Sequence, residues 1–334
     1  MNERLHPLAL GEVLDRTAQM YRAQFLRFLG IAAFPTGVLL VFVALTAGFS
    51  SLIVHAKDAG TSGNTLGIAI FAYLGVLGVV GLPVFGGMMA LSWAALTDAT
   101  AATFLGGTFT IRGAYGRVWG RRWRVLWLLT METFFLGVIP VSAVVAVTAL
   151  ANKAGLGALG AWGTVVMFVP IAALAGGALW LLLRVCLGFA ACVEEQVSAW
   201  QALKRSTVLS KGTKGRLFLV FLLAYALEIL LTMWFFFLVV FLVQFVPGLQ
   251  GAKNEGAASA VIGFAFYGLW FLVQVLTRPV YGIGLTLIYF DQKIRKEGFD
   301  VEWMMRHAGM AGIPAAFEGP AAPTEASPWL VLPD

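Results

Sequence analysis

Four charged side chains stand inside long apolar runs of this chain, and they are the residues best placed to do chemistry. They are two acids and two bases: Glu132, Arg184, Glu228 and Arg278. A charge in an apolar segment costs a few kcal/mol to insert into a bilayer, so it normally faces a partner or water. Counted from the ends of the apolar runs at ~1.5 Å per residue, Glu132 and Arg184 lie about 12 Å deep, and Glu228 and Arg278 lie roughly 18 to 20 Å deep.

These matching depths predict two ion pairs, Glu132 with Arg184 and Glu228 with Arg278. In one interpretation, the pairs line a polar interior that handles an ion, a proton or a lipid head group. In the other, they fix how the helices pack, because two balanced pairs account for the charges without a substrate. The pattern favours the structural role. Gln274 shares a helix face with Arg278 and is expected to hydrogen-bond to a neighbouring helix.

The elements that must position these residues are membrane-spanning helices. Of the 334 residues, 60% are hydrophobic and only 12% are charged, and the mean hydropathy is +0.85. Soluble domains carry about a quarter charged residues, so a water-soluble fold is nearly excluded. A spanning helix needs roughly 20 mostly apolar residues. The chain offers six such runs, near residues 28–54, 66–96, 125–150, 161–191, 217–246 and 260–290.

The distribution of Lys and Arg predicts how these helices are oriented, since cytoplasmic loops carry the excess of basic residues. The three loops expected on the outer side hold only Lys57, Lys153 and Lys253. Both termini are therefore expected in the cytoplasm. The net charge of +6 points to anionic lipid rather than nucleic acid, because the basic residues sit between apolar runs. The candidate head-group contacts are Arg121, Arg122, Arg124, Lys204, Arg205, Lys211, Lys214 and Arg216.

A weak internal repeat organises the chain into three helical hairpins. Before the first, third and fifth spans stands an amphipathic basic segment, over residues 18–27, 114–124 and 202–216. Trp119, Trp123 and Trp127 are spaced four apart and indicate an aromatic belt at the membrane interface. We therefore expect an N-terminal amphipathic segment (1–27), a six-helix membrane domain (28–290), a helical extension (291–307) and a disordered tail (308–334).

Three short stretches resemble a known membrane family. They are LALGEVLDRTAQMYR at residues 8–22, the group VEE, ALKRS and LSKG between residues 193 and 212, and YFDQKIRKEGFD at residues 289–300. Together they resemble the membrane domain fused to some glycerophosphoryl diester phosphodiesterases and related bacterial inner-membrane proteins. The resemblance implies a six-helix fold and a place in the bacterial cytoplasmic membrane. The phosphodiesterase activity does not carry over, because membrane helices leave no room for a catalytic barrel.

The expected function is that of a non-enzymatic membrane protein, a scaffold or sensor in envelope or lipid homeostasis. The chain has only His6, His55 and His307, which are scattered and form no credible hydrolytic or metal site. We assign no catalytic, metal-binding or cofactor-binding residue. The alternative is a transporter of a lipid, ion or small solute that uses the intramembrane Glu and Arg residues. That alternative predicts a water-accessible cavity at their depth.

Overall fold

The computed structural model describes residues 6–155, 161–245 and 256–307, and every regular element in these ranges is helical. Six helices are long and apolar enough to cross a membrane: Phe25–Asp58, Gly63–Phe104, Arg122–Lys153, Phe168–Glu194, Lys214–Phe241 and Phe266–Glu297. The prediction of an all-α membrane protein with six spans is confirmed. The tail expected to be disordered, residues 308–334, lies outside the described residues.

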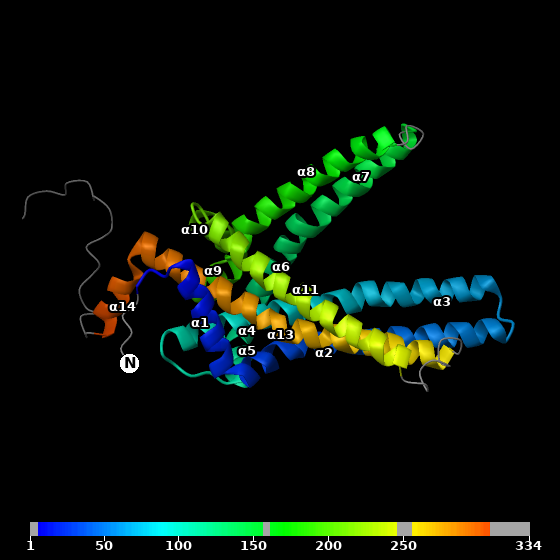
Figure 1. Cartoon of the computed structure of the whole chain (residues 1–334), viewed down its shortest axis with the longest axis horizontal. Coiled ribbons are helices and arrows are strands. Elements are labelled where there is room, and N and C mark those ends of the chain that lie inside the picture. Colours follow the sequence, from blue (N-terminus) through cyan, green and yellow to red (C-terminus); the bar gives the residue numbers. More distant parts are fainter. Residues whose placement is uncertain (1–5, 156–160, 246–255, 308–334) are drawn as a thin grey trace, which may run out of the picture.

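The helices pair into three hairpins in chain order (Figure 1). The first contains α1 (Leu10–Ala23), α2 (Phe25–Asp58), α3 (Gly63–Val76), the π-helical segment η1 (Leu77–Gly81) and α4 (Leu82–Phe104). The second contains α5 (Ile111–Trp119), α6 (Arg122–Thr133), the π-helical segment η2 (Phe134–Val138), α7 (Ile139–Lys153), α8 (Ala161–Val185) and α9 (Gly188–Glu194). The third contains α10 (Ala199–Leu209), α11 (Lys214–Phe245), α13 (Gly256–Glu297) and α14 (Phe299–His307).

A short helix leads into each hairpin where the repeat predicts an amphipathic segment. These helices are α1, α5 and α10, and each buries one face. In α10 the buried positions are Ala199, Ala202, Leu203, Ser206 and Leu209, a spacing that forms one stripe along a helix. Its start is fixed by the side chain of the residue before it, Ser198, which accepts a hydrogen bond from the Gln201 backbone N–H.

The last span is the central helix of the bundle. Its most apolar window is 61% buried, against 6% for the second and third spans. Two glycines let neighbouring helices approach α13 closely. A Cβ added at Gly282 would lie 3.2 Å from the Leu96 Cβ of α4, and one at Gly284 would lie 3.0 Å from the Val220 side chain of α11. Glycine at these positions therefore lets α4 and α11 pack closely against α13, and any larger residue would push these helices apart.

The two π-helical segments lie directly before helices that carry a proline in their first turn. Pro83 and Pro140 each occupy the first turn of the α-helix that follows η1 or η2. Proline has no backbone N–H and clashes with the carbonyl four residues earlier, and a π-turn is one way a long helix accommodates this. Pro35, Pro170 and Pro279 instead lie inside continuous helices.

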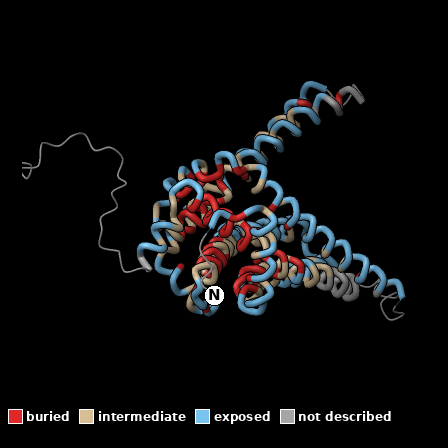
Figure 2. The backbone as a smooth tube through the Cα atoms, turned by 60° about the vertical axis from the view of Figure 1, so that its left-hand side comes forward, coloured by how far each residue is buried: buried red, intermediate tan, exposed pale blue. Residues whose placement is uncertain are grey.

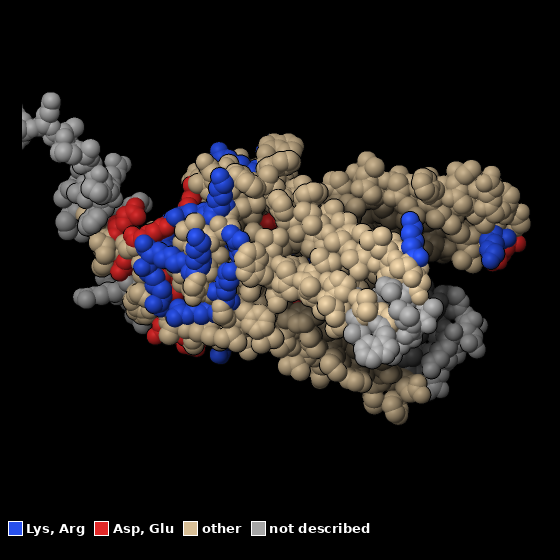
Figure 3. All heavy atoms as spheres, turned by 90° about the horizontal axis from the view of Figure 1, so that it is seen from above, with Lys and Arg blue, Asp and Glu red and all other residues tan. Residues whose placement is uncertain are grey.

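The two ends of the molecule differ in packing and in charge. At one end, α1, α5, α9, α10 and the adjoining ends of the spans form a compact core, while the α2–α3 and α7–α8 arms extend separately from it (Figures 1 and 2). Buried residues concentrate in that core and the arms are mostly exposed (Figure 2). Lys and Arg gather over the compact end, which we call the basic end (Figure 3). The opposite tips of the arms form the far end.

Candidate functional site

Glu228 and Arg278 meet in the membrane region through an amide that lies between them. Gln274 donates from Nε2 to Glu228 Oε1 at 2.7 Å and accepts on Oε1 from the Arg278 Nε at 3.4 Å. Tyr281 donates its hydroxyl to Glu228 Oε2 at 3.1 Å. Arg278 is 7% exposed and also donates to the sulfur of Met89 at 2.8 Å. The predicted helix-to-helix hydrogen bond of Gln274 is confirmed, and the acid and base are bridged rather than directly paired.

This arrangement satisfies the polar groups within the protein. Both carboxylate oxygens of Glu228 have donors, and the donors come from α13, the helix packed against it. Sequence reasoning missed Tyr281 and Met89, although Tyr281 stands three residues after Arg278 and therefore lies on the same helix face. A cluster that is internally satisfied holds two helices in register, and it leaves few groups to bind a solute.

Glu132 and Arg184 are not brought together, so the predicted pair is wrong. The Arg184 guanidinium lies over the Trp180 ring, with Cζ 4.6 Å from the ring centre. Glu132 turns instead towards α9, where its Oε1 would lie 2.9 Å from a Cβ added at Gly188. That oxygen is buried without a hydrogen-bond partner, although the residue as a whole is partly exposed. The two residues have matching depths along their helices, but the Glu132 side chain approaches Gly188 of α9 and the Arg184 side chain lies along its own helix over Trp180.

The strongest polar cluster lies at the basic end and joins α9, α10 and α13. Glu195 accepts from the Arg205 Nε on both oxygens, at 3.0 and 2.9 Å, and from the Tyr289 hydroxyl at 2.8 Å. Arg205 also pairs with Glu297. Burial lowers the pKa of Arg205, but its hydrogen bonds to Glu195 and Glu297 more than offset this and raise the pKa above its usual value. These ion pairs and hydrogen bonds hold the end of α9 against α10 and α13.

Asp291 is a second centre of the same end and is 1% exposed. It accepts from the Arg295 Nε at 2.9 Å, as the four-residue spacing predicts, and from the Arg216 Nη1 at 3.3 Å. It also accepts from the Leu8 backbone N–H at 2.8 Å, and Arg295 donates to the Leu8 carbonyl at 2.8 Å. The carboxylate therefore joins the N-terminal segment, α11 and α13.

Ser206 joins the break between α8 and α9 to α10. Its hydroxyl accepts from the Leu187 backbone N–H at 3.1 Å and donates to the Arg184 carbonyl at 2.8 Å, and the residue is fully buried. These are backbone groups that the end of one helix and the start of the next leave without helical partners. Sequence reasoning placed Ser206 in a motif but missed this role.

Replacing Ser206 with alanine should lower the free energy of unfolding by about 1–3 kcal/mol, because the buried Leu187 N–H loses its acceptor and the Arg184 carbonyl keeps only the longer hydrogen bond from Ser210, at 3.4 Å. Thr207→Ala is the matched control, since that hydroxyl bonds only to the Lys204 carbonyl of its own helix. It should change stability by less than about 0.5 kcal/mol. Unfolding by dodecyl sulfate in mixed micelles, followed by circular dichroism, measures the free energy of unfolding of both variants. Equal losses for the two variants would contradict the bridging role.

Four of the eight candidate lipid contacts are held by groups of the protein outside their own helices. Arg121 donates to the Val193 carbonyl and Arg124 to the Gln196 carbonyl, at 2.8 and 2.7 Å. Arg205 and Arg216 are held by the carboxylates described above. These four arginines fix the basic end and are poor candidates for a ligand.

The other four candidates, Arg122, Lys204, Lys211 and Lys214, form no ion pair with any residue that the structure describes. Three of them lie against tryptophan rings. Arg122 is 5.3 Å from the Trp119 centre and Lys204 is 5.6 Å from that of Trp200, while Lys214 lies over Trp180. Tryptophan with an adjacent cation is typical of a membrane interface. Trp119, Trp123 and Trp127 are all more than half exposed, as a belt requires.

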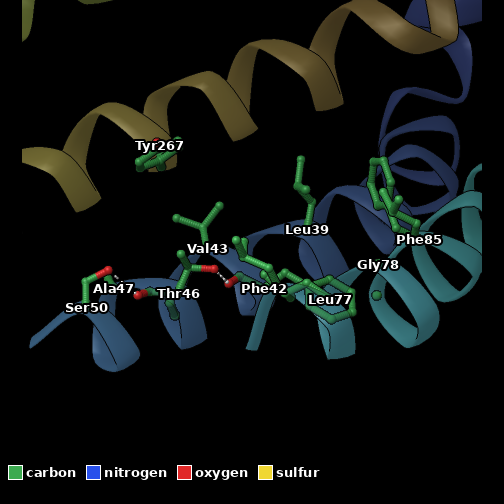
Figure 4. Close-up of a pocket in the computed structure, with 14 residues that line it drawn as sticks. Leu39, Phe42, Val43, Thr46, Ala47, Ser50, Leu77, Gly78, Phe85 and Tyr267 are labelled. Atoms are coloured by element: carbon green, nitrogen blue, oxygen red, sulfur yellow. Dashed lines mark hydrogen bonds between the residues drawn. The ribbon is translucent and has the colours of Figure 1, made fainter. Parts of the chain in front are cut away.

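An apolar groove lies between the middle and the far end, and it has a volume of about 970 Å³. Residues of α2 and of the α3–η1–α4 helix form one side, and Tyr267 of α13 faces them across it (Figure 4). Thr46 is one of its few polar residues and hydrogen-bonds to the Tyr73 hydroxyl at 2.9 Å. None of the four intramembrane charged residues lines this groove or the smaller one between α11 and α13. Its walls suit a hydrocarbon chain.

The fold and these clusters define a polytopic helical membrane protein whose polar groups are concentrated at one end. In comparisons with known proteins, no family model, no curated protein and no solved structure matches the chain.

Proposed function

We propose that the protein is a non-enzymatic scaffold of the bacterial cytoplasmic membrane, with its basic end and both termini in the cytoplasm and anionic lipid as its partner. The observation that carries this proposal is the use of the polar groups. Side chains of other residues hydrogen-bond to Glu228, Arg278, Glu195 and Asp291, and these bonds join separate helices. None of the four intramembrane charged residues lines either of the two grooves described above. Such groups stabilise an arrangement of helices rather than bind a passing solute.

We also propose kinship with the membrane domain fused to glycerophosphoryl diester phosphodiesterases. The three stretches that carry the resemblance contact one another at the basic end. Leu8 of the first binds Asp291 and Arg295 of the third, and Arg205 of the second shares Glu195 with Tyr289 of the third. Three stretches that pack into one cluster depend on one another for that packing, so we expect them to occur in the same protein. Their contacts at the basic end therefore support the resemblance.

Thiol labelling tests the scaffold against the transporter. With Cys186 and Cys192 replaced by alanine, Glu228→Cys, Arg278→Cys and Thr277→Cys should resist membrane-impermeant maleimide added from either side. Thr277 is 1% exposed and neighbours Arg278, so its variant probes the same depth with both charges in place. Labelling at these positions would demonstrate a hydrated cavity and favour transport.

Two further variants serve as controls and test the orientation. Lys211→Cys lies at the basic end and should react only from the cytoplasmic side, while Lys57→Cys lies at the far end and should react only from the outside. The reverse pattern would overturn the proposed topology while leaving the test of hydration intact.

Transport is the second candidate, and one observation favours it. The buried Oε1 of Glu132 has no hydrogen-bond partner, which is unusual for a carboxyl in an apolar setting. Labelling of Glu132→Cys in the same Cys-free protein would show water at this site, and protection of it would support the scaffold.

A further inference from the structure

Two cations lie against a single tryptophan ring where the second and third hairpins meet. The Arg184 Cζ lies 4.6 Å from the Trp180 ring centre and the Lys214 Nζ lies 4.5 Å from it. Trp180 and Arg184 stand one turn apart near the end of α8, and Lys214 is the first residue of α11. Trp180 is 48% exposed, so the ring and its two cations are accessible from outside the bundle.

Neither cation is neutralised by the protein. Within the described ranges, Arg184 and Lys214 form no ion pair, and their side chains donate no hydrogen bond. Three arginines of the same end, Arg205, Arg216 and Arg295, each bind a carboxylate instead. An arginine presents five N–H donors in a planar fork, a geometry that matches the oxygens of a phosphate. Two unneutralised cations on one ring are therefore available to bind an anion from outside.

The surroundings favour a negatively charged ligand. The positive end of the α11 dipole lies at Lys214, and the next residue, Gly215, has open space where a side chain would be. Exposed apolar residues continue along α11 from this point, including Phe218 and Leu222. A ligand with a phosphate at the ring and hydrocarbon chains along α11 matches both features.

We propose that Trp180, Arg184 and Lys214 bind the phosphate of an anionic phospholipid, which then bridges α8 to α11. The site deepens the proposed function and rests on it, because it names where the anionic lipid is held. It also gives Arg184 a role that its predicted pairing with Glu132 does not. Direct packing between α8 and α11 is sparse, so a lipid at this position would join the second hairpin to the third.

The test uses the purified full-length protein in detergent and counts retained lipid by native mass spectrometry. Mixed micelles containing phosphatidylglycerol or phosphatidylcholine are titrated in, and thermal unfolding is followed in parallel. The Arg184→Gln/Lys214→Gln double variant should bind phosphatidylglycerol about thirtyfold more weakly, since each interfacial cation contributes a factor of about five to six. Its stabilisation by that lipid should fall accordingly.

Matched controls separate this site from the general charge of the basic end. Arg22→Gln/Arg112→Gln removes the same charge at exposed positions of α1 and α5, and neither arginine is a candidate lipid contact or lies against the Trp180 ring. It should retain the wild-type affinity within about twofold. Trp180→Leu removes the ring but no charge and should weaken binding several-fold, which keeps the site testable if the double variant does not fold.

Each result has a defined meaning. If the wild type shows no preference for phosphatidylglycerol over phosphatidylcholine, the proposed lipid partner is wrong. If the preference exists but the Arg184→Gln/Lys214→Gln variant and Trp180→Leu both keep it, the site is wrong while the partner stands. If inorganic phosphate alone stabilises the wild type as much as the lipid does, the ligand is free phosphate, and the lipid assignment is overturned.

Discussion

Asp291→Ala should destabilise the protein by about 3–5 kcal/mol, because it leaves buried cationic and backbone donors without their shared acceptor. The Asp291 side chain is 2% exposed and accepts from Leu8, Arg216, Gln292 and Arg295. The N-terminal segment should also become accessible to protease, since both the N–H and the carbonyl of Leu8 are held by Asp291 and Arg295. Unfolding in mixed micelles and limited trypsin digestion measure the two effects.

Asp98→Ala is the control for this substitution. Asp98 also forms an ion pair with an arginine, but the side chain of that residue, Arg117, is 50% exposed. Surface pairs contribute about 1 kcal/mol or less, so this variant should unfold almost like the wild type. If Asp291→Ala costs no more than Asp98→Ala, Asp291 does not hold the basic end together.

Arg278→Met should cost about 3–5 kcal/mol, because the carboxylate of Glu228 is left in the membrane region with only the neutral donors Gln274 and Tyr281. The double variant Glu228→Gln/Arg278→Met removes both charges and keeps an amide for Gln274 to bond. It should lie within about 1–2 kcal/mol of the wild type, because a balanced pair contributes little net stability. Unfolding of the four members of this cycle gives the coupling directly.

The cycle discriminates between the two roles of this pair. Recovery in the double variant is the expected result for residues that fix helix packing. Additive losses would mean that each residue interacts with something other than its partner, and they would contradict the bridged arrangement of Glu228, Gln274 and Arg278.

The sequence predicts the spans and their pairing because the bilayer imposes them. Length, apolar composition and the clustering of basic residues locate the six spans, and the structure places a short helix before each hairpin as the repeat predicts. Depth along a helix also brings Glu228 and Arg278 into one cluster. The four-residue spacing likewise identifies the Asp291–Arg295 pair.

What the sequence does not specify is rotation about each helix axis. Glu132 and Arg184 have matching depths, yet one turns towards Gly188 and the other towards Trp180. The rotation of a helix about its axis depends on its packing against helices that are distant in sequence. The spacing of residues within one helix therefore does not predict it. The role of Ser206 is not predictable for the same reason, because its partners lie at the end of α8 and in the break before α9.

The separate arms give the molecule unequal cross-sections at its two ends (Figures 1 and 2). In a bilayer, lipid must fill the space between the separated arms, so hydrocarbon chains there contact protein on more than one side, whereas at the basic end the helices pack against one another. Chains between the arms should exchange with the surrounding bilayer more slowly than chains at the outer surface of a single helix. A membrane rich in this protein should therefore contain a second, slower population of lipid that grows with protein density.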